Sequence, residues 1–253
     1  MATIVFVHGA WTGGWIWRDV AARLRAEGYD VYTPTLTGLG ERVHLGGPDV
    51  DLDTHITDII NVLSYEDLDD VVLVGHSYSG IVVEGVADRA PDRLAGLVYV
   101  DCAPLSDGMA LFNLFGDEGR AATEQVANEY GDGWKLPFPS IEDLGNIASI
   151  AGLDDAALDL MTRRGTPQPI GTYRQPLSLT HEFDGEYTRS LVACSLGDFS
   201  VEWLKSGIAS GEPMLEPISA PDWTFYELET GHWPMLSEPE ELSEIMIEIV
   251  NRS

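Results

Sequence analysis

Basic side chains are scarce in this chain. Its 253 residues include 14 Lys and Arg against 42 Asp and Glu, which gives a formal net charge of −28 at pH 7. A polypeptide this acidic repels the phosphates of nucleic acids and the surfaces of anionic lipids, so we expect no nucleic-acid partner and no membrane partner. High acidity also keeps proteins soluble and occurs in proteins adapted to high salt, so it says little about the charge of a substrate.

Cysteine and metal-binding patterns are also rare. The two cysteines, Cys102 and Cys194, each end an apolar run and lack Cys-x-x-Cys spacing, which is typical of reduced core residues. The six histidines form neither a His-x-x-x-His pair nor a His-Glu-x-x-His motif. No local pattern therefore supports a metal site, and we predict none.

Long hydrophobic runs are absent as well. No apolar stretch approaches the length that crosses a bilayer. The first residues lead into a strand-like run at 3–7 without a basic leader, so we expect no signal peptide and predict a cytoplasmic location.

What the chain does contain is an alternation of short apolar runs with segments of helical spacing. The runs lie at 3–7, 30–33, 71–75, 94–101, 190–195 and 223–228. This alternation predicts an α/β fold with a mostly parallel, doubly wound sheet. Helices are predicted over 15–27, 53–63 and 238–250, with Asp53 or Thr54 as N-cap of the second.

The stretch from about 104 to 186 breaks this alternation. It contains clusters of Gly and Pro, a helical pattern at 154–161, an extended pattern at 167–179 and no convincing buried strand. We therefore predict one domain over 1–253 with an inserted, mainly helical cap at about 104–186.

A serine follows one of the predicted strands in a tight turn. The segment GHSYSG at 75–80 predicts the end of a strand, a turn carrying Ser77 and the start of a helix. A serine hydroxyl needs a base to become a nucleophile, and such a turn projects it clear of the backbone. Ser79 replaces the second glycine of the usual Gly-x-Ser-x-Gly pattern. An ordinary turn that happens to contain a serine is the alternative, and the preceding strand favours the nucleophile.

A histidine follows the last predicted strand and precedes the final helix. That position suits His232 as the general base for a serine held by another loop. For the carboxylate that orients this base we predict Asp198, which lies just after the run at 190–195. Asp101, at the end of the run at 94–101, is the alternative, and Glu202 is a third candidate.

A glycine-rich loop, HGAWTGGW at 8–15, follows the first predicted strand. Unpaired backbone N–H groups at the start of a helix can receive developing negative charge. We assign the oxyanion hole to the N–H groups of Ala10 and Tyr78. The glycine patterns of phosphate-binding loops are absent, and a plain structural turn is the remaining alternative.

With these parts together the chain resembles the α/β-hydrolase superfamily, in the branch of plant methyl esterases, hydroxynitrile lyases and small bacterial esterases. The segments that carry the resemblance are VHGAWTGGW at 7–15, GHSYSG at 75–80 and the pair at 231–232. The resemblance implies hydrolysis without any cofactor by a Ser-His-acid triad. It also implies Ala10 and Tyr78 as oxyanion donors.

The same resemblance implies Asp198 as the acid, but the linker from there to His232 is longer than usual in this branch, which keeps Asp101 open. The lyases carry a lysine directly after the catalytic histidine. This chain has Trp233 there, which disfavours cyanohydrin cleavage.

We therefore predict a serine hydrolase that cleaves a small, apolar or aromatic carboxylic ester, lactone or carbamate through an acyl-enzyme. Trp11 and Trp233 are the predicted substrate-binding residues. Four further aromatic side chains are candidates for the pocket, although core packing explains them as well: Trp15, Phe112, Phe115 and Trp134. The alternative functions are a cofactor-free lyase or oxygenase, and a small-molecule receptor with a residual hydrolase site. The expected partner is a small-molecule substrate, and a homodimer is compatible with the sequence.

Overall fold

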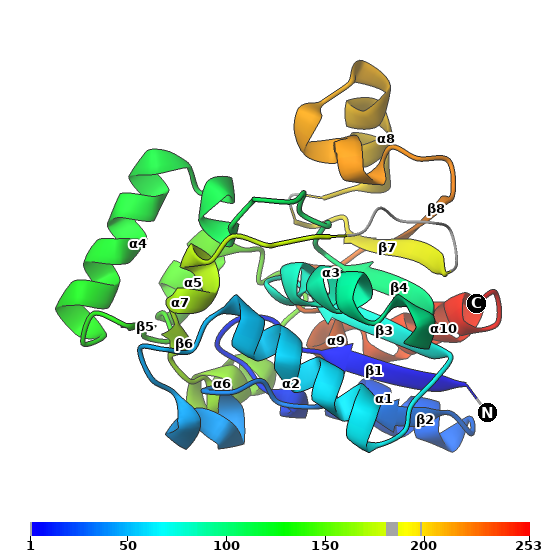
Figure 1. Cartoon of the computed structure of the whole chain (residues 1–253), viewed down its shortest axis with the longest axis horizontal. Coiled ribbons are helices and arrows are strands. Elements are labelled where there is room, and N and C mark those ends of the chain that lie inside the picture. Colours follow the sequence, from blue (N-terminus) through cyan, green and yellow to red (C-terminus); the bar gives the residue numbers. More distant parts are fainter. Residues whose placement is uncertain (1, 181–186, 198) are drawn as a thin grey trace.

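A sheet of six parallel strands lies at the centre of the molecule (Figure 1). The computed structural model describes residues 2–180, 187–197 and 199–253. Across the sheet the strands are β2 (Asp30–Tyr32), β1 (Thr3–Val7), β3 (Val71–His76), β4 (Leu94–Val100), β7 (Thr188–Cys194) and β8 (Trp223–Leu228). Each predicted apolar run forms one of these strands, and the predicted parallel α/β class is confirmed.

The order of the strands places a crevice at one end of the sheet. The chain passes from β1 outward to β2 and then returns to β3 on the other side of β1. Loops that leave the carboxyl ends of β1 and β3 therefore diverge to opposite sides, which opens a crevice between them. Residues 8–15 and Ser77 lie in these two loops.

Helices cover both faces of the sheet, because successive strand residues point to opposite sides. Val5 and Val7 of β1 join the apolar core that also contains residues of α2 (Leu52–Tyr65) and α3 (Ser79–Arg89). Ile4 and Phe6 join the core on the other face, with residues of α1 (Arg18–Ala26) and α10 (Pro239–Val250). Both faces of the strand are buried, as a parallel sheet requires.

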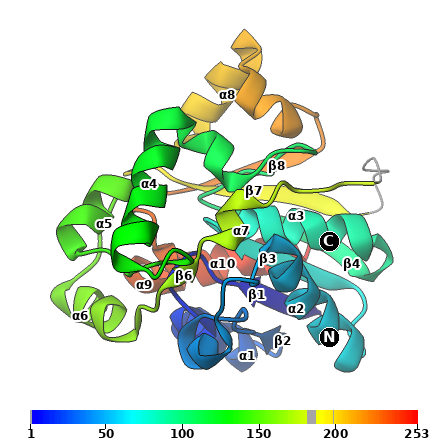
Figure 2. The same ribbon diagram turned by 60° about the vertical axis from the view of Figure 1, so that its left-hand side comes forward.

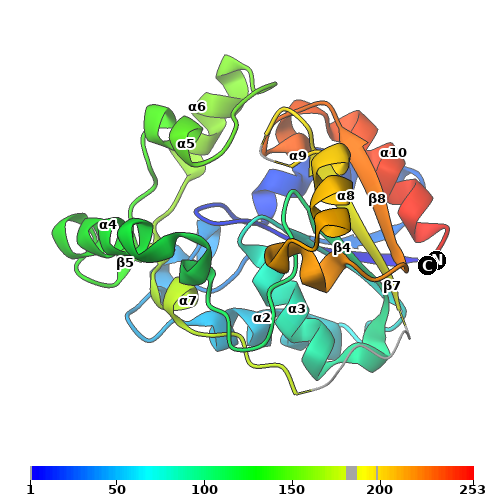
Figure 3. The same ribbon diagram turned by 90° about the horizontal axis from the view of Figure 1, so that it is seen from above.

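Several short elements complete the fold. Outside the cap they are the 3-10 helices η1 (Gly14–Trp17), η2 (Gly40–Leu45) and η3 (Pro91–Arg93), and the helix α9 (Pro234–Ser237). Helix α8 (Val201–Ser210) and the 3-10 helix η5 (Pro213–Ile218) connect β7 to β8 and stand above these two strands in Figure 1, so that they are drawn in front of the sheet when the molecule is seen from above (Figure 3). Among the described residues no helix has the length and apolarity to span a bilayer.

The N-terminus of α2 differs from its prediction. The cap is Asp51, whose carboxylate accepts a hydrogen bond from the Thr54 backbone N–H at 2.9 Å. The Thr54 hydroxyl lies 3.4 Å from the Asp51 N–H and completes a capping box. The prediction of Asp53 or Thr54 as the cap is therefore wrong, because Thr54 is the reciprocal partner in the third helical position.

The cap elements lie beyond the carboxyl ends of the strands, opposite the two termini (Figures 1 and 2). Between β4 and β7 the chain forms η4 (Leu111–Leu114), α4 (Gly116–Tyr130), β5 (Lys135–Leu136), α5 (Ile141–Ile147), α6 (Asp155–Arg164), β6 (Gln168–Pro169) and α7 (Gly171–Arg174). The predicted helix at 154–161 is present as α6. The predicted extended stretch at 167–179 contains a helical turn, and β5 pairs with β6 where no strand was predicted.

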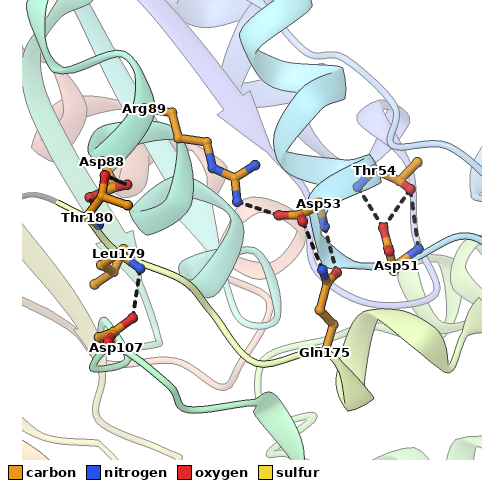
Figure 4. A network of polar contacts seen from close by, with 9 residues as sticks. All are labelled: Asp51, Asp53, Thr54, Asp88, Arg89, Asp107, Gln175, Leu179 and Thr180. Atoms are coloured by element: carbon orange, nitrogen blue, oxygen red, sulfur yellow. Dashed lines mark hydrogen bonds and ion pairs between the residues drawn. The ribbon is translucent and has the colours of Figure 1, made fainter.

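Polar contacts anchor the segment that returns from the cap to the sheet (Figure 4). The carboxylate of Asp53 accepts from Gln175 Nε2 at 2.9 Å and pairs with Arg89, and the Asp53 N–H donates to Gln175 Oε1 at 2.9 Å. Farther along, the Leu179 N–H donates to an Asp107 carboxylate oxygen at 2.8 Å. The return segment is thus fastened to the start of α2 and to the loop after β4.

We expect Ile56→Ala to destabilise the fold strongly. Ile56 is 0% exposed, and its side chain meets α3 at Gly85, where an added Cβ would lie 2.3 Å from Ile56 Cδ1. Truncation at such a site costs about 2–5 kcal/mol, measured as the free energy of unfolding in urea. Tyr65 ends the same helix and is 85% exposed, so Tyr65→Ala is the matched control, with a change of about 0.5 kcal/mol. Equal losses in the two variants would contradict this account of the core.

Candidate active site

Ser77 occupies a sharp turn between β3 and α3. Its backbone has φ +53°, and its N–H donates to the Val100 carbonyl of the neighbouring strand at 3.2 Å. A Cβ at Gly75 would lie 2.8 Å from Val83 Cγ2 and 2.9 Å from the Ser79 carbonyl oxygen, so the turn needs glycine there. These contacts produce the strand, turn and helix that the sequence predicts.

Ser79 has a structural role that explains the departure from the usual pattern. Its buried hydroxyl accepts from the His76 N–H at 2.7 Å and lies 2.9 Å from the Val7 carbonyl oxygen, to which it can donate. A glycine could make neither bond. The second serine therefore ties the turn to the end of β1.

Three of the six described non-glycine residues with positive φ lie in the loops that follow three neighbouring strands. Trp11, Ser77 and Asp101 have φ of 61°, 53° and 48°, values that non-glycine residues seldom adopt. They follow β1, β3 and β4, which are adjacent in the sheet. Such conformations persist only where the surroundings enforce them, and they cluster at functional sites.

The imidazole of His232 is hydrogen-bonded to a buried carboxylate. Its Nδ1 lies 2.6 Å from Asp101 Oδ2, and the two side chains are 15% and 3% exposed. The other carboxylate oxygen, Asp101 Oδ1, accepts from the Cys194 N–H at 3.0 Å. Because Nδ1 donates to the carboxylate, Nε2 is left as the acceptor of the ring.

The partner of His232 is thus Asp101, the alternative candidate of the sequence analysis. Asp198, the candidate preferred there, lies outside the described residues. Glu202 is exposed in the first turn of α8. Asp101 follows β4 as directly as Ser77 follows β3, and this position at a strand end is the sequence signal that points to it.

The two predicted oxyanion donors face the same cavity as Ser77 and His232. Within the described part of the chain, no hydrogen bond uses the backbone N–H of Ala10 or of Tyr78. Two unpaired donors at a cavity wall can stabilise negative charge that develops on a substrate oxygen.

Cap residues hold the loop that carries Ala10. The Trp11 N–H donates to Gln168 Oε1 at 3.2 Å, the Trp11 indole N–H donates to the Leu136 carbonyl at 3.3 Å, and the Thr166 N–H donates to the Trp11 carbonyl at 2.9 Å. The position of the oxyanion loop therefore depends on the cap.

The cavity has a volume of about 290 Å³ and a mostly apolar wall. Of the predicted pocket aromatics, Trp11 and Phe115 line it. Trp233 is not among its described lining residues. It packs in the core with its ring at 4.9 Å from that of His232, which corrects its predicted contact with substrate. Many residues that the sequence did not indicate also line the wall, among them Ile147, Ser149, Tyr173, Phe199, Met214 and Leu215.

Two buried histidines support the loops in their neutral form. His8 Nε2 accepts from the Leu36 N–H at 3.1 Å, and its Nδ1 donates to the Gly9 carbonyl at 2.8 Å. His55 Nε2 donates to the Thr37 carbonyl at 2.8 Å, and its Nδ1 accepts from the Tyr78 hydroxyl at 2.8 Å. Burial lowers the pKa of His8 to about 3 and that of His55 to about 4.

No three His, Cys, Asp or Glu side chains among the described residues converge in a way that could hold a metal ion. The groups that the site does bring together are the Ser77 hydroxyl, the His232 imidazole, the Asp101 carboxylate and the backbone N–H groups of Ala10 and Tyr78.

Comparison with known proteins shows the family of the chain. The model of the alpha/beta hydrolase family matches residues 4–245. The chain belongs to this family. It is 36% identical to a carbendazim hydrolyzing esterase of Nocardioides sp. (strain SG-4G), in an alignment that covers 96% of this chain and 98% of that one. It is 27% identical to methylesterase 3 of Arabidopsis thaliana, with 98% and 96% of the two chains covered.

Solved structures share the fold of this α/β-hydrolase. An extracellular alpha/beta-hydrolase from a Paenibacillus species superposes with a TM-score of 0.79 at 22% identity, over 98% of this chain and 99% of that one. A pyrethroid hydrolase from Sphingobium faniae JZ-2 gives 0.69 at 21% identity, over 99% and 97% of the chains. Together with the esterase relatives, the family identifies the chain as a carboxylic ester hydrolase, as the sequence predicts.

We expect the free energy of unfolding of this hydrolase to decrease as the pH is lowered, and part of this decrease to depend on His55. Its pKa in the folded state, about 4, lies below the unfolded value of 6.5, so the unfolded chain binds a proton first as the pH drops. The contribution of the neutral His55 ring to the free energy of unfolding is complete above pH 6.5. It is lost as the pH falls towards 4, and the loss is roughly 1–2 kcal/mol at pH 5.

Urea unfolding at pH 7 and pH 5 measures this loss. His55→Gln removes the titrating ring, so its stability should change less between the two pH values than that of the parent. Both proteins carry the same surface carboxylates, which cancel in the comparison. If the two proteins showed the same pH dependence, His55 would have the same pKa in the folded and the unfolded state, and the expectation would be wrong.

Proposed function

We propose that this esterase hydrolyses small, neutral, apolar or aromatic carboxylic esters through an acyl-enzyme on Ser77. Lactones and carbamates are further substrates of the same chemistry. The observation that carries the proposal is the convergence on one cavity of Ser77, the hydrogen-bonded pair His232 and Asp101, and the unpaired N–H groups of Ala10 and Tyr78.

In the first half-reaction Ser77 Oγ attacks the acyl carbon while His232 Nε2 accepts the hydroxyl proton. The carbonyl oxygen becomes an oxyanion, which receives hydrogen bonds from Ala10 N–H and Tyr78 N–H. When the tetrahedral intermediate collapses, the bond between the acyl carbon and the leaving oxygen breaks. His232 then returns its proton to the leaving alcohol.

In the second half-reaction a water molecule takes the place of the alcohol. His232 Nε2 accepts a proton from the water, whose oxygen attacks the acyl carbon of the ester on Ser77. Collapse of this intermediate releases the carboxylic acid and returns the proton to Ser77 Oγ. In both halves the imidazolium is stabilised by Asp101, whose burial strengthens the interaction because water does not screen it.

The wall of the cavity supports a neutral substrate. Its described lining residues contain no Lys or Arg, and they include the hydrogen-bonded pair of His232 and Asp101. A substrate with a free carboxylate would find no cation there, whereas aromatic and alkyl groups fit the apolar wall. The relatives named for hydrolysis of carbendazim and of pyrethroids, and the methylesterases, support the same classes of substrate.

We expect Ser77→Ala to lower kcat on 4-nitrophenyl and methyl esters by about 10⁴-fold or more, because the acyl-enzyme has no attachment point. A fluorophosphonate should label the parent at one residue, Ser77, and abolish turnover. Ser106 is exposed on the surface and Ser106→Ala is the control, with kcat unchanged. Residual activity above a few per cent in Ser77→Ala would exclude Ser77 as the nucleophile of ester hydrolysis.

Two further variants distinguish the carboxylates. Asp101→Asn is expected to lower kcat by about 10³ to 10⁴-fold, because an amide favours the wrong tautomer of His232. The asparagine oxygen can still accept from the Cys194 N–H, so the fold should be retained, as a thermal melt would verify. Asp198→Asn is expected to keep kcat within a few fold of the parent. A large loss of kcat in Asp198→Asn together with a small loss in Asp101→Asn would assign the triad acid to Asp198.

A further inference from the structure

A second imidazole lies next to the proposed base. His76, the last residue of β3, directly precedes Ser77, is 1% exposed, and has its ring centroid 4.7 Å from that of His232. The Trp17 indole lies perpendicular to it, at 6.2 Å between centroids. His76 does not line the substrate cavity, so its role must be exerted through its neighbours.

One nitrogen of His76 is committed to the main chain of His232. His76 Nε2 lies 2.7 Å from the His232 carbonyl oxygen, and a carbonyl can only accept, so Nε2 carries the proton. Burial holds the pKa of His76 well below its ordinary value, and the nearby His232 and His8 lower it further. The ring is therefore neutral, and its single N–H is used in this bond.

The other nitrogen has no partner among the residues that the structure describes. His76 Nδ1 is buried and makes no hydrogen bond to any of them, which is a costly condition for a polar atom. A Cβ at Gly9 would lie 2.8 Å from this nitrogen, so the glycine of the oxyanion loop makes room for the ring. An apolar residue would fill the same space without an unsatisfied nitrogen, but it could not donate to the His232 carbonyl.

We propose that His76 is a positioning residue for the general base, and that its Nε2–H fixes the main chain of His232 so that the imidazole faces Ser77. The inference rests on the proposed function. It completes a clamp around His232, whose N–H donates to the Ser149 carbonyl at 2.8 Å and whose Nδ1 bonds Asp101 at 2.6 Å. Without His76, the His232 carbonyl loses its hydrogen-bond donor, and the His232 imidazole can turn away from Ser77.

Two variants of nearly equal side-chain length test the donor. His76→Gln keeps an N–H that can reach the carbonyl, whereas His76→Met offers no donor. We expect His76→Met to lower kcat by about 10 to 100-fold with KM within about 3-fold, because misplacement by about 1 Å costs this much in rate without changing the pocket. His76→Gln should recover kcat to within about 5-fold of the parent. The rate of fluorophosphonate labelling at Ser77 should follow kcat in both variants.

Three outcomes would overturn the proposal. An unchanged kcat in His76→Met would show that the donor has no effect on the base. Equal losses in the methionine and glutamine variants would assign the effect to packing. A rise in KM alone would place the effect on substrate binding.

If His76→Met does not fold, the parent protein supplies the test. In a sample with ¹⁵N-labelled histidine, His76 should remain protonated on Nε2 and unprotonated on Nδ1 from about pH 5 to about pH 8. If His76 carried its proton on Nδ1 alone, Nε2 could not donate to the His232 carbonyl, and the proposal would be wrong. Failure of the proposed function is distinguishable, because the parent would then neither react with the fluorophosphonate nor hydrolyse esters, whatever the state of His76.

Discussion

The hydrogen bond between Asp101 and His232 joins three strand ends that are far apart in sequence. Asp101 follows β4, His232 follows β8, and the second carboxylate oxygen binds the N–H of Cys194 at the end of β7, the strand between them. Because all three strands are parallel and adjacent, their carboxyl ends meet at one edge. A buried carboxylate there satisfies a backbone donor and orients an imidazole at once.

Around this bond the site is built from backbone that is held in unfavourable conformations. Trp11, Ser77 and Asp101 have positive φ at the ends of β1, β3 and β4. Neutral, buried histidines support these loops, since His8 bonds the oxyanion loop and His55 bonds the side chain of Tyr78. A neutral imidazole can hold two neighbouring groups in place because its rigid ring offers one hydrogen-bond donor and one acceptor without the penalty of a buried charge.

The cap does more than cover the cavity. Its segment at 147–149 lines the wall, and the Ser149 carbonyl also accepts from the His232 N–H. Another cap residue, Gln168, holds the loop that carries Ala10. The insertion that shapes the substrate pocket thus contacts the backbone at the base and at the oxyanion loop, so changes in the cap that alter substrate choice also act on the geometry of the reacting groups.

The sequence alone determined the six strands and the main helices of the sheet, because alternating and helical apolar spacing is enforced by burial of each element's own residues. It also indicated Ser77 and His232, which stand beside local strand and glycine patterns. It misplaced the N-cap of α2, where Asp51 and Thr54 share the capping box, and it placed Trp233 in the pocket. The carboxylate beside His232 and the walls of the cavity were decided by tertiary structure, because they depend on which strand ends and cap segments become neighbours, and spacing along the chain does not encode that proximity.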